Sequence, residues 1–231
     1  MGYVKRIVCL ANSYKYPGGR CIAGIEILEN GKFGSWIRPI SARETAEVSY
    51  DEYKYQSGHT PKLLDIIDVP LLKAAPHNHQ TENHILDPKS WWVKRGELAW
   101  DDLERIREQP ESLWINTDHT RAGLYDCMSP SQAQTLKSSL LLIKKKTFAV
   151  EVGSSTWNGR TKRIYRGKFE HKGTRHNFSL TDPVARRVFA DKEEGDYPLS
   201  DVYLCVGLTE PYEEDGRCHK LVAAVIANPA L

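Results

Sequence analysis

The chain has 231 residues, 40% of them hydrophobic and 27% charged, and a formal net charge of +2. This composition excludes a disordered chain, and the length suits either one large domain or two domains of about 100 residues. The longest apolar runs are too short for a membrane-spanning helix or a secretory signal, so we expect a cytoplasmic protein with no membrane segment. Five scattered cysteines, none in a Cys-x-x-Cys pair, argue against a disulfide framework or a thiolate zinc site.

In the first half of the chain, runs rich in β-branched and aromatic residues predict β-strands, and glycine and proline residues between the runs predict turns. The runs with the strongest strand character are Lys5–Ala11, Arg20–Leu28, Ser35–Ile40 and Leu64–Leu72. A short helix is predicted over Trp100–Arg107, because acidic residues stand in its first turn and arginines near its end.

The second half repeats this pattern. Ser129–Leu136 and Asp182–Phe189 predict two short helices, since each begins with a capping residue followed by proline. A turn at Lys172-Gly173 predicts a hairpin that sets two basic strands side by side. The predicted strands are Leu140–Val152, Arg163–His171, Arg175–Leu180, Val202–Leu208 and Lys220–Ile226. Two strand series around a helical middle indicate a mainly β protein of two barrels, which we assign to residues 1–115 and 116–231.

The near-neutral total charge conceals a strongly basic segment. Residues 137–187 contain thirteen Lys and Arg and three acidic residues, a formal charge of +10, so the rest of the chain carries −8. Such asymmetry indicates a polyanionic partner, with nucleic acid as the first candidate. The alternative is a solvated, lysine-rich sheet face that opposes aggregation.

Arg20, Trp36 and Arg38 form the first candidate site. A glycine turn brings Arg20 to the start of one strand, and Trp36 and Arg38 lie two positions apart, so both project from the same face of the next. A planar ring beside a guanidinium group can stack on a base and hold a phosphate. The alternative is that Trp36 is a core residue and Arg38 pairs with a local carboxylate.

A polar loop at residues 76–84 forms a second candidate pocket. Its histidines His77 and His79 have a spacing that zinc tolerates if both face one way, but no fourth ligand is evident and we expect no metal. Glu82 and His84 could form an acid/base pair. The chain has no common hydrolase, P-loop or deaminase motif, so we assign no catalytic residue and no cofactor. The pocket residues are Gln80, Glu82, Asn83 and His84, with Asp182 as a further member.

Asp182 has two interpretations. It stands between a threonine and a proline at the start of the third predicted helix, where an aspartate commonly caps the helix. The alternative is a catalytic carboxylate.

The third candidate lies within the basic segment. In the strand at residues 163–169, odd positions are mostly aromatic and even positions are aliphatic or basic. If the aromatic side chains are core, the outer row is cationic and suits phosphates. The expected nucleic-acid contacts are Trp157, Arg160, Lys162, Arg163, Arg166, Lys168, Lys172, Arg175 and His176.

Several segments resemble the bacterial dual OB-containing domain proteins, and the resemblance spans nearly the whole chain. It implies two OB-type barrels in tandem, nucleic-acid binding and a setting in mobile-element or antiviral defence systems, and it implies no catalytic residue. Three of the segments, at residues 19–24, 36–41 and 80–84, lie outside the basic segment in the first half of the chain, which indicates a second, more selective pocket. The resembling segments are Gly19–Gly24, Trp36–Ser41, Gln80–His84, Leu180–Pro183 and Lys220–Ile226.

We therefore expect a protein that binds nucleic acid or nucleotides, in which the basic segment holds the backbone and the first candidate site reads a base. Two alternatives stay open. One is a metal-dependent or acid/base enzyme acting on nucleic acid or nucleotides, with Glu82, His84 and Asp182 in one cleft. The other is a protein-interaction subunit of a defence complex, whose basic face binds an acidic partner.

Overall fold

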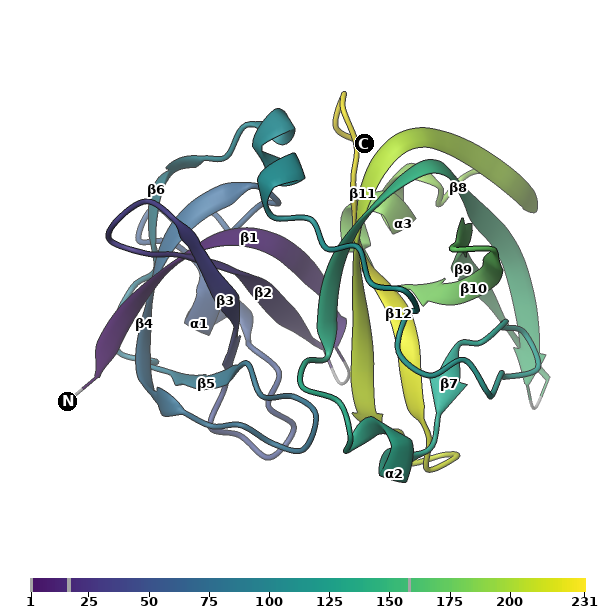
Figure 1. Ribbon diagram of the computed structural model, residues 1–231, viewed down its shortest axis with the longest axis horizontal. Coiled ribbons are helices and arrows are strands. Elements are labelled where there is room, and N and C mark those ends of the chain that lie inside the picture. Colours follow the sequence, from purple (N-terminus) through teal and green to yellow (C-terminus); the bar gives the residue numbers. More distant parts are fainter. Residues whose placement is uncertain (1, 16–17, 158) are drawn as a thin grey trace. The chain divides into compact units, whose positions relative to one another are not determined.

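A computed structural model describes residues 2–15, 18–157 and 159–231, although the side chain of Trp157 is outside the described part (Figure 1). The chain divides into two compact units. One comprises Met1–Arg107 with Lys137–Ser139, and the other comprises Glu108–Leu136 with Leu140–Leu231. The expected boundary after residue 115 lies inside the second unit.

The first unit is a closed β-barrel. Five strands form a ring in the order β1-β2-β3-β5-β4, and β4 pairs with β1 to close it. β3 and β5 are parallel, the other neighbours in the ring are antiparallel, and β6 adds to the edge of β4. The elements are β1 (Tyr3–Lys15), β2 (Gly19–Ile27), β3 (Phe33–Ile40), α1 (Tyr50–Tyr53), β4 (Asp65–Ala74), β5 (Asn83–Leu86), β6 (Val93–Glu97) and the 3-10 helix η1 (Trp100–Arg105).

The second unit repeats the same ring. Its order is β8-β9-β10-β12-β11, closed by β8 and β11, with β10 and β12 parallel. Both units are thus five-stranded barrels of the OB type, which confirms the predicted fold class. The elements are β7 (Cys127–Met128), α2 (Pro130–Ala133), β8 (Leu140–Trp157), β9 (Arg160–His171), β10 (Thr174–Leu180), α3 (Pro183–Val188), β11 (Gly195–Pro211) and β12 (Cys218–Ile226).

Each barrel encloses its own apolar core, built from strand positions that alternate with polar ones. The predicted hairpin between β9 and β10 is confirmed: Lys172 and Gly173 both have positive φ, at 50° and 79°, as a tight two-residue turn requires. The first core includes Ile7, Ile22, Ile37, Ile67 and Leu86, and the second includes Phe148, Phe169, Phe178, Leu204 and Val222.

In the second barrel, β8, β9 and β11 extend furthest beyond their predicted bounds. β8 and β9 continue as a hairpin to residues 157 and 160, and β11 begins at Gly195, where it pairs with Val152. The β8–β9 extension is mainly polar, so it lacks the apolar alternation that marks a strand. The start of β11 does place Tyr197 and Leu199 against the core, but Pro198 stands between them, and proline disfavours a strand prediction. Among the described residues no helix has the length and apolar character to span a membrane.

Candidate functional site

Arg38 lies in a buried polar network of the first barrel. The parallel pairing of β3 with β5 sets Arg38 beside Asn83, and its Nε donates to Asn83 Oδ1 at 2.6 Å. Its Nη2 lies 2.9 Å from Glu82 Oε1, and the two side chains are only 7% and 3% exposed. Ser139 also donates to Glu82, and Asn83 donates to Gln80. The structure therefore brings together Arg38 and most of the second candidate pocket, as a buried ion pair rather than an open site.

Trp36 is buried, so the exposed aromatic ring on this barrel's first hairpin is a different residue. Arg20 stacks over the ring of Tyr14 at 4.4 Å, and Tyr14 is 47% exposed. The two residues face each other across β1 and β2. Tyr14 could not be identified from the sequence, because only the hairpin register places it opposite Arg20.

The polar loop before β5 is a turn and not an extended segment. The backbones of His77 and Gln80 pair with each other, and Asn78 has a φ of 51°. His77 is consequently exposed and His79 is buried, so the expectation that they would face one way in an extended segment is wrong. Among the described residues no three His, Cys, Asp or Glu side chains are placed to hold a metal ion.

Glu82 and His84 have different partners. Glu82 pairs with Arg38, whereas His84 Nδ1 lies 2.6 Å from the hydroxyl of Tyr3. Burial, with a contribution from Lys5, lowers the pKa of His84 below its ordinary value. The neutral imidazole is therefore favoured in a structural hydrogen bond.

Asp182 caps helix α3 in the second unit. Its Oδ1 accepts hydrogen bonds from the backbone N–H groups of Val184 and Ala185, and its Oδ2 accepts one from Val225. The side chain thus fastens the start of α3 to β12, as the capping interpretation predicts. Glu82 and His84 belong to the other unit.

Arg166 and His176 are buried, which corrects the prediction that they lie on an outer cationic row. Arg166 is 7% exposed, because residues 120–126 cover it and its Nη2 lies 2.7 Å from Asp126 Oδ2. Burial opposes ionisation of Asp126, but hydrogen bonds from Thr120 and Arg166 hold the pKa of its carboxyl group below the usual range. Arg166 therefore serves as an internal clamp in this structure.

His176 is 2% exposed and packs against Phe169 and Phe178 in the barrel core. Burial, with smaller contributions from nearby cations, lowers the pKa of this imidazole to about 3. Lys168 is half-buried, and its Nζ lies 2.8 Å from both Glu151 and Asp196. Neither residue offers an open positive charge.

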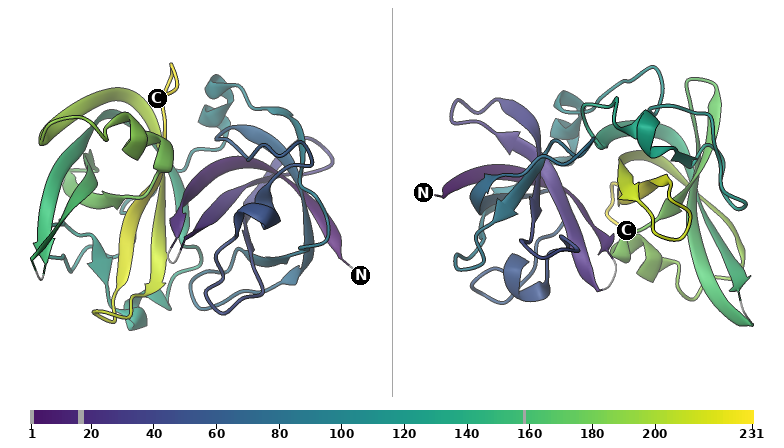
Figure 2. Two further views of the ribbon diagram at one scale, coloured as in Figure 1. Left: turned by 180° about the vertical axis from the view of Figure 1, so that it is seen from behind. Right: turned by 90° about the horizontal axis from the view of Figure 1, so that it is seen from below.

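The open cations lie elsewhere in the basic segment. Arg160, Lys162 and Arg175 are exposed, Arg163 is partly buried, and Lys172 is exposed with Glu111 3.6 Å away. Beyond Val152, the last residue of β8 that pairs with β11, residues 153–157 pair only with residues 160–164. This β8–β9 ribbon (residues 153–164) holds Arg160, Lys162 and Arg163 and no acidic residue. Figure 2 shows its strands in green, extending from the second barrel.

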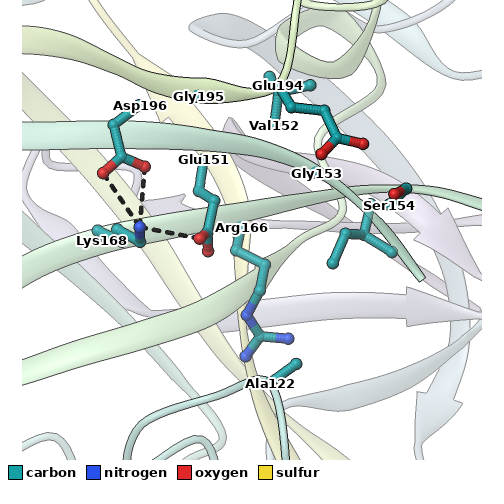
Figure 3. Close-up of a pocket in the computed structure, with 11 residues that line it drawn as sticks. Ala122, Glu151, Val152, Gly153, Ser154, Arg166, Lys168, Glu194, Gly195 and Asp196 are labelled. Atoms are coloured by element: carbon teal, nitrogen blue, oxygen red, sulfur yellow. Dashed lines mark hydrogen bonds and ion pairs between the residues drawn. The ribbon is translucent and has the colours of Figure 1, made fainter.

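A pocket of about 580 Å³ lies on the second barrel at the base of the β8–β9 ribbon (Figure 3). Its cations are compensated: Lys168 by Glu151 and Asp196, and Arg166 by Asp126. Because Lys168 carries one positive charge against two carboxylates, a negative charge remains there, and the carboxylate of Glu194 adds a second. The pocket is lined by residues 151–154 of β8, Ile164, Arg166 and Lys168 of β9, residues 194–196, and Ala122.

The duplicated ring agrees with a comparison of the sequence with known families. Residues 5–225 match the model of the dual OB-containing domain. The chain belongs to this family. No curated protein and no solved structure matches it. Membership in the dual OB-containing domain family indicates an OB-fold binding module, in which the face of the second and third strands and the adjoining loops commonly hold ligands.

Proposed function

We propose that this dual OB-containing domain protein binds single-stranded nucleic acid and that the β8–β9 ribbon is its main electrostatic contact. The observation that carries the proposal is the pair Arg160 and Lys162. Both are exposed, stand two positions apart on one face of β9, and have no ion-pair partner among the described residues. The ribbon also occupies the place of the loop between the first two strands of an OB barrel, a common oligonucleotide contact.

The first barrel supports the proposal with a second contact. Tyr14 and Arg20 lie on the corresponding hairpin between the first two strands of their ring. An exposed ring can stack on a base of any sequence, and the guanidinium group can hold the adjacent phosphate. Backbone contacts from cations and stacking on aromatic rings are the usual combination for single strands.

The test is a double substitution, Arg160→Ala with Lys162→Ala, in the full chain. Fluorescence anisotropy with labelled single-stranded DNA and RNA gives the affinity at several salt concentrations. We expect weaker binding, and a slope of log affinity against log salt that is smaller by about 1.4, because two phosphate contacts are lost at about 0.7 each.

A charge-matched control replaces Arg187 and Lys192, both exposed on α3 or in the turn after it, by alanine. The control removes the same total charge from the same unit but leaves the ribbon intact. Its slope of log affinity against log salt should therefore equal that of the wild-type protein. Equal affinities and slopes for the two double variants would refute the assignment of the ribbon.

The setting in a bacterial mobile-element or antiviral defence system is a further part of the proposal, supported by the family resemblance alone. The same two double variants test it in cells. If nucleic-acid binding serves defence, plaque counts of a phage panel should rise with the ribbon variant and stay unchanged with the α3 control. Equal plaque counts with and without the wild-type protein would remove the defence setting and leave the binding proposal intact.

A further inference from the structure

The pocket at the base of the β8–β9 ribbon differs in charge from the ribbon itself. The even positions of β9 share one face and run from Arg160 and Lys162 through Ile164 to Arg166 and Lys168. The first two are open cations, and the last two line the pocket. A nucleic-acid strand whose phosphates contact the ribbon can therefore continue along this face into the pocket.

Phosphates do not suit the pocket. Lys168 is held by two carboxylates, and Arg166 donates to Asp126, Asn177 and Ser179. What the pocket offers in excess is carboxylate oxygen, from Glu151, Glu194 and Asp196. An ionised carboxylate accepts hydrogen bonds and donates none, so the pocket favours a ligand rich in N–H donors.

Glu194 is the acceptor with the greatest capacity. Its carboxylate has no hydrogen-bond or ion-pair partner among the described residues, and Figure 3 shows it turned toward Gly153 and Ser154 in the pocket. Glu151 and Asp196, by contrast, already accept from Lys168. A ligand in the pocket would therefore find Glu194 available for two hydrogen bonds at once.

Building on the proposed nucleic-acid binding, we propose that this pocket takes one nucleobase and that Glu194 makes it selective for guanine. The Watson–Crick edge of guanine carries two adjacent donors, the ring N–H and the exocyclic amino group, which match the two oxygens of a carboxylate as a guanidinium does. Adenine and cytosine offer one amino group. Uracil and thymine place carbonyl oxygens on both sides of their ring N–H, and a carboxylate repels these. The volume of about 580 Å³ is within the ordinary range for a small-ligand pocket.

Hypoxanthine provides the sharpest probe, because it is guanine without the exocyclic amino group. We expect an oligothymidylate with one central guanine to bind about ten-fold more tightly than the same strand with hypoxanthine, the effect of one hydrogen bond to a charged group. Glu194→Gln should abolish the ratio, since the amide presents a donor where an acceptor is needed. Glu193→Gln is the matched control, because it removes the same charge one position away at a side chain outside the pocket.

The outcomes separate the two proposals. Equal binding of the two strands by the wild-type protein, or an unchanged ratio in the Glu194→Gln variant, would overturn the guanine pocket, while a loss of affinity in the ribbon variant would still support nucleic-acid binding. If neither strand binds, the proposed function fails. Titration with free guanosine and inosine, followed by NMR, then decides the pocket: binding of guanosine that Glu194→Gln removes supports it, and no binding refutes it.

Discussion

The two barrels share one ring order but close the gap between their parallel strands differently. In the first barrel, β3 and β5 pair at three positions, and Arg38 bonds across them to Asn83. In the second, β10 and β12 pair at only two positions, and residues 124–128 fill the remaining gap. Leu124 pairs with β10, and β7 pairs with β12.

An arginine, an asparagine and a carboxylate meet in both barrels, with different consequences. Arg38 joins Asn83 to Glu82 next to the closing strands, whereas Arg166 joins Asn177 to Asp126 and thereby holds the added segment against the sheet. The order of the strands determines where each barrel closes. Whether a cation near that point is exposed to a ligand depends on the segments that pack over it. This dependence explains why Arg166 clamps the fold and Arg160 remains available.

The largest expected effect is on the first barrel. Arg38→Met removes one partner of a buried ion pair and leaves Glu82 charged and buried, which costs about 3–5 kcal/mol. Hydrogen exchange measured by mass spectrometry should show faster exchange in β1–β5 and unchanged protection in β8–β12. Arg95→Met is the control, because its half-exposed ion pair with Asp68 is worth about 1 kcal/mol or less. Equal protection in both variants would contradict the role of Arg38.

A smaller effect is expected where the second barrel depends on its added strand. Met128 in β7 is fully buried against Ala133, Leu208 and Cys218. Met128→Ala leaves a cavity and should destabilise this barrel by about 2–4 kcal/mol, with faster exchange in β10 and β12. The half-exposed Val188 on α3 offers a truncation control that should shift the urea midpoint little. A midpoint for Met128→Ala that matches the control would show that β7 is dispensable for closing the barrel.

The sequence predicts those features that depend on local pattern. The buried faces of the strands, the Lys172-Gly173 turn and the Asp182 cap follow from alternation and capping chemistry within a few residues. The alternation of side chains along the strand also places Arg166 on the outer face of β9. Its burial could not be predicted, because Asp126 covers it from forty positions away.

The candidate site required the same kind of distant information. The pairing of Tyr14 with Arg20 depends on hairpin register, and that of Arg38 with Glu82 on a parallel strand contact. The pocket brings Ala122 together with residues of β8, β9 and the start of β11. Sequence pattern identified the ribbon cations Arg160 and Lys162 but ended the flanking strands too early, since polar ribbons lack an apolar face.

The core of the second barrel contains a further difference from the first. His84 of the first barrel shares a hydrogen bond with Tyr3, whereas neither ring nitrogen of His176 has a hydrogen-bond partner among the described residues. The titratable groups that influence His176 are Lys220, His171 and Lys145, all of which disfavour its protonation. A neutral, unpaired imidazole in an aromatic cluster is thus a weak point of the second barrel.

The smallest effect at neutral pH, and the clearest pH signature, should come from His176→Leu. The folded-state pKa of about 3 lies below the ordinary value of 6.5, so the unfolded chain binds the extra proton between these limits. Above pH 6.5 the imidazole is neutral in both states and does not lower the free energy of unfolding. As the pH falls from 6.5 toward 3, protonation of the unfolded chain lowers the free energy of unfolding. The His176→Leu variant does not lose stability in this way and, at pH 7.5, should gain about 1 kcal/mol from removing two unpaired nitrogens.

The measurement is urea unfolding of the second barrel at pH 7.5 and pH 5. Between these two values the free energy of unfolding should decrease less for the variant than for the wild-type protein. Replacing the exposed His119 of the same unit by leucine should keep the wild-type decrease. Parallel pH profiles for all three proteins would show that the pKa of His176 is the same in the folded and the unfolded chain, and would refute the burial argument.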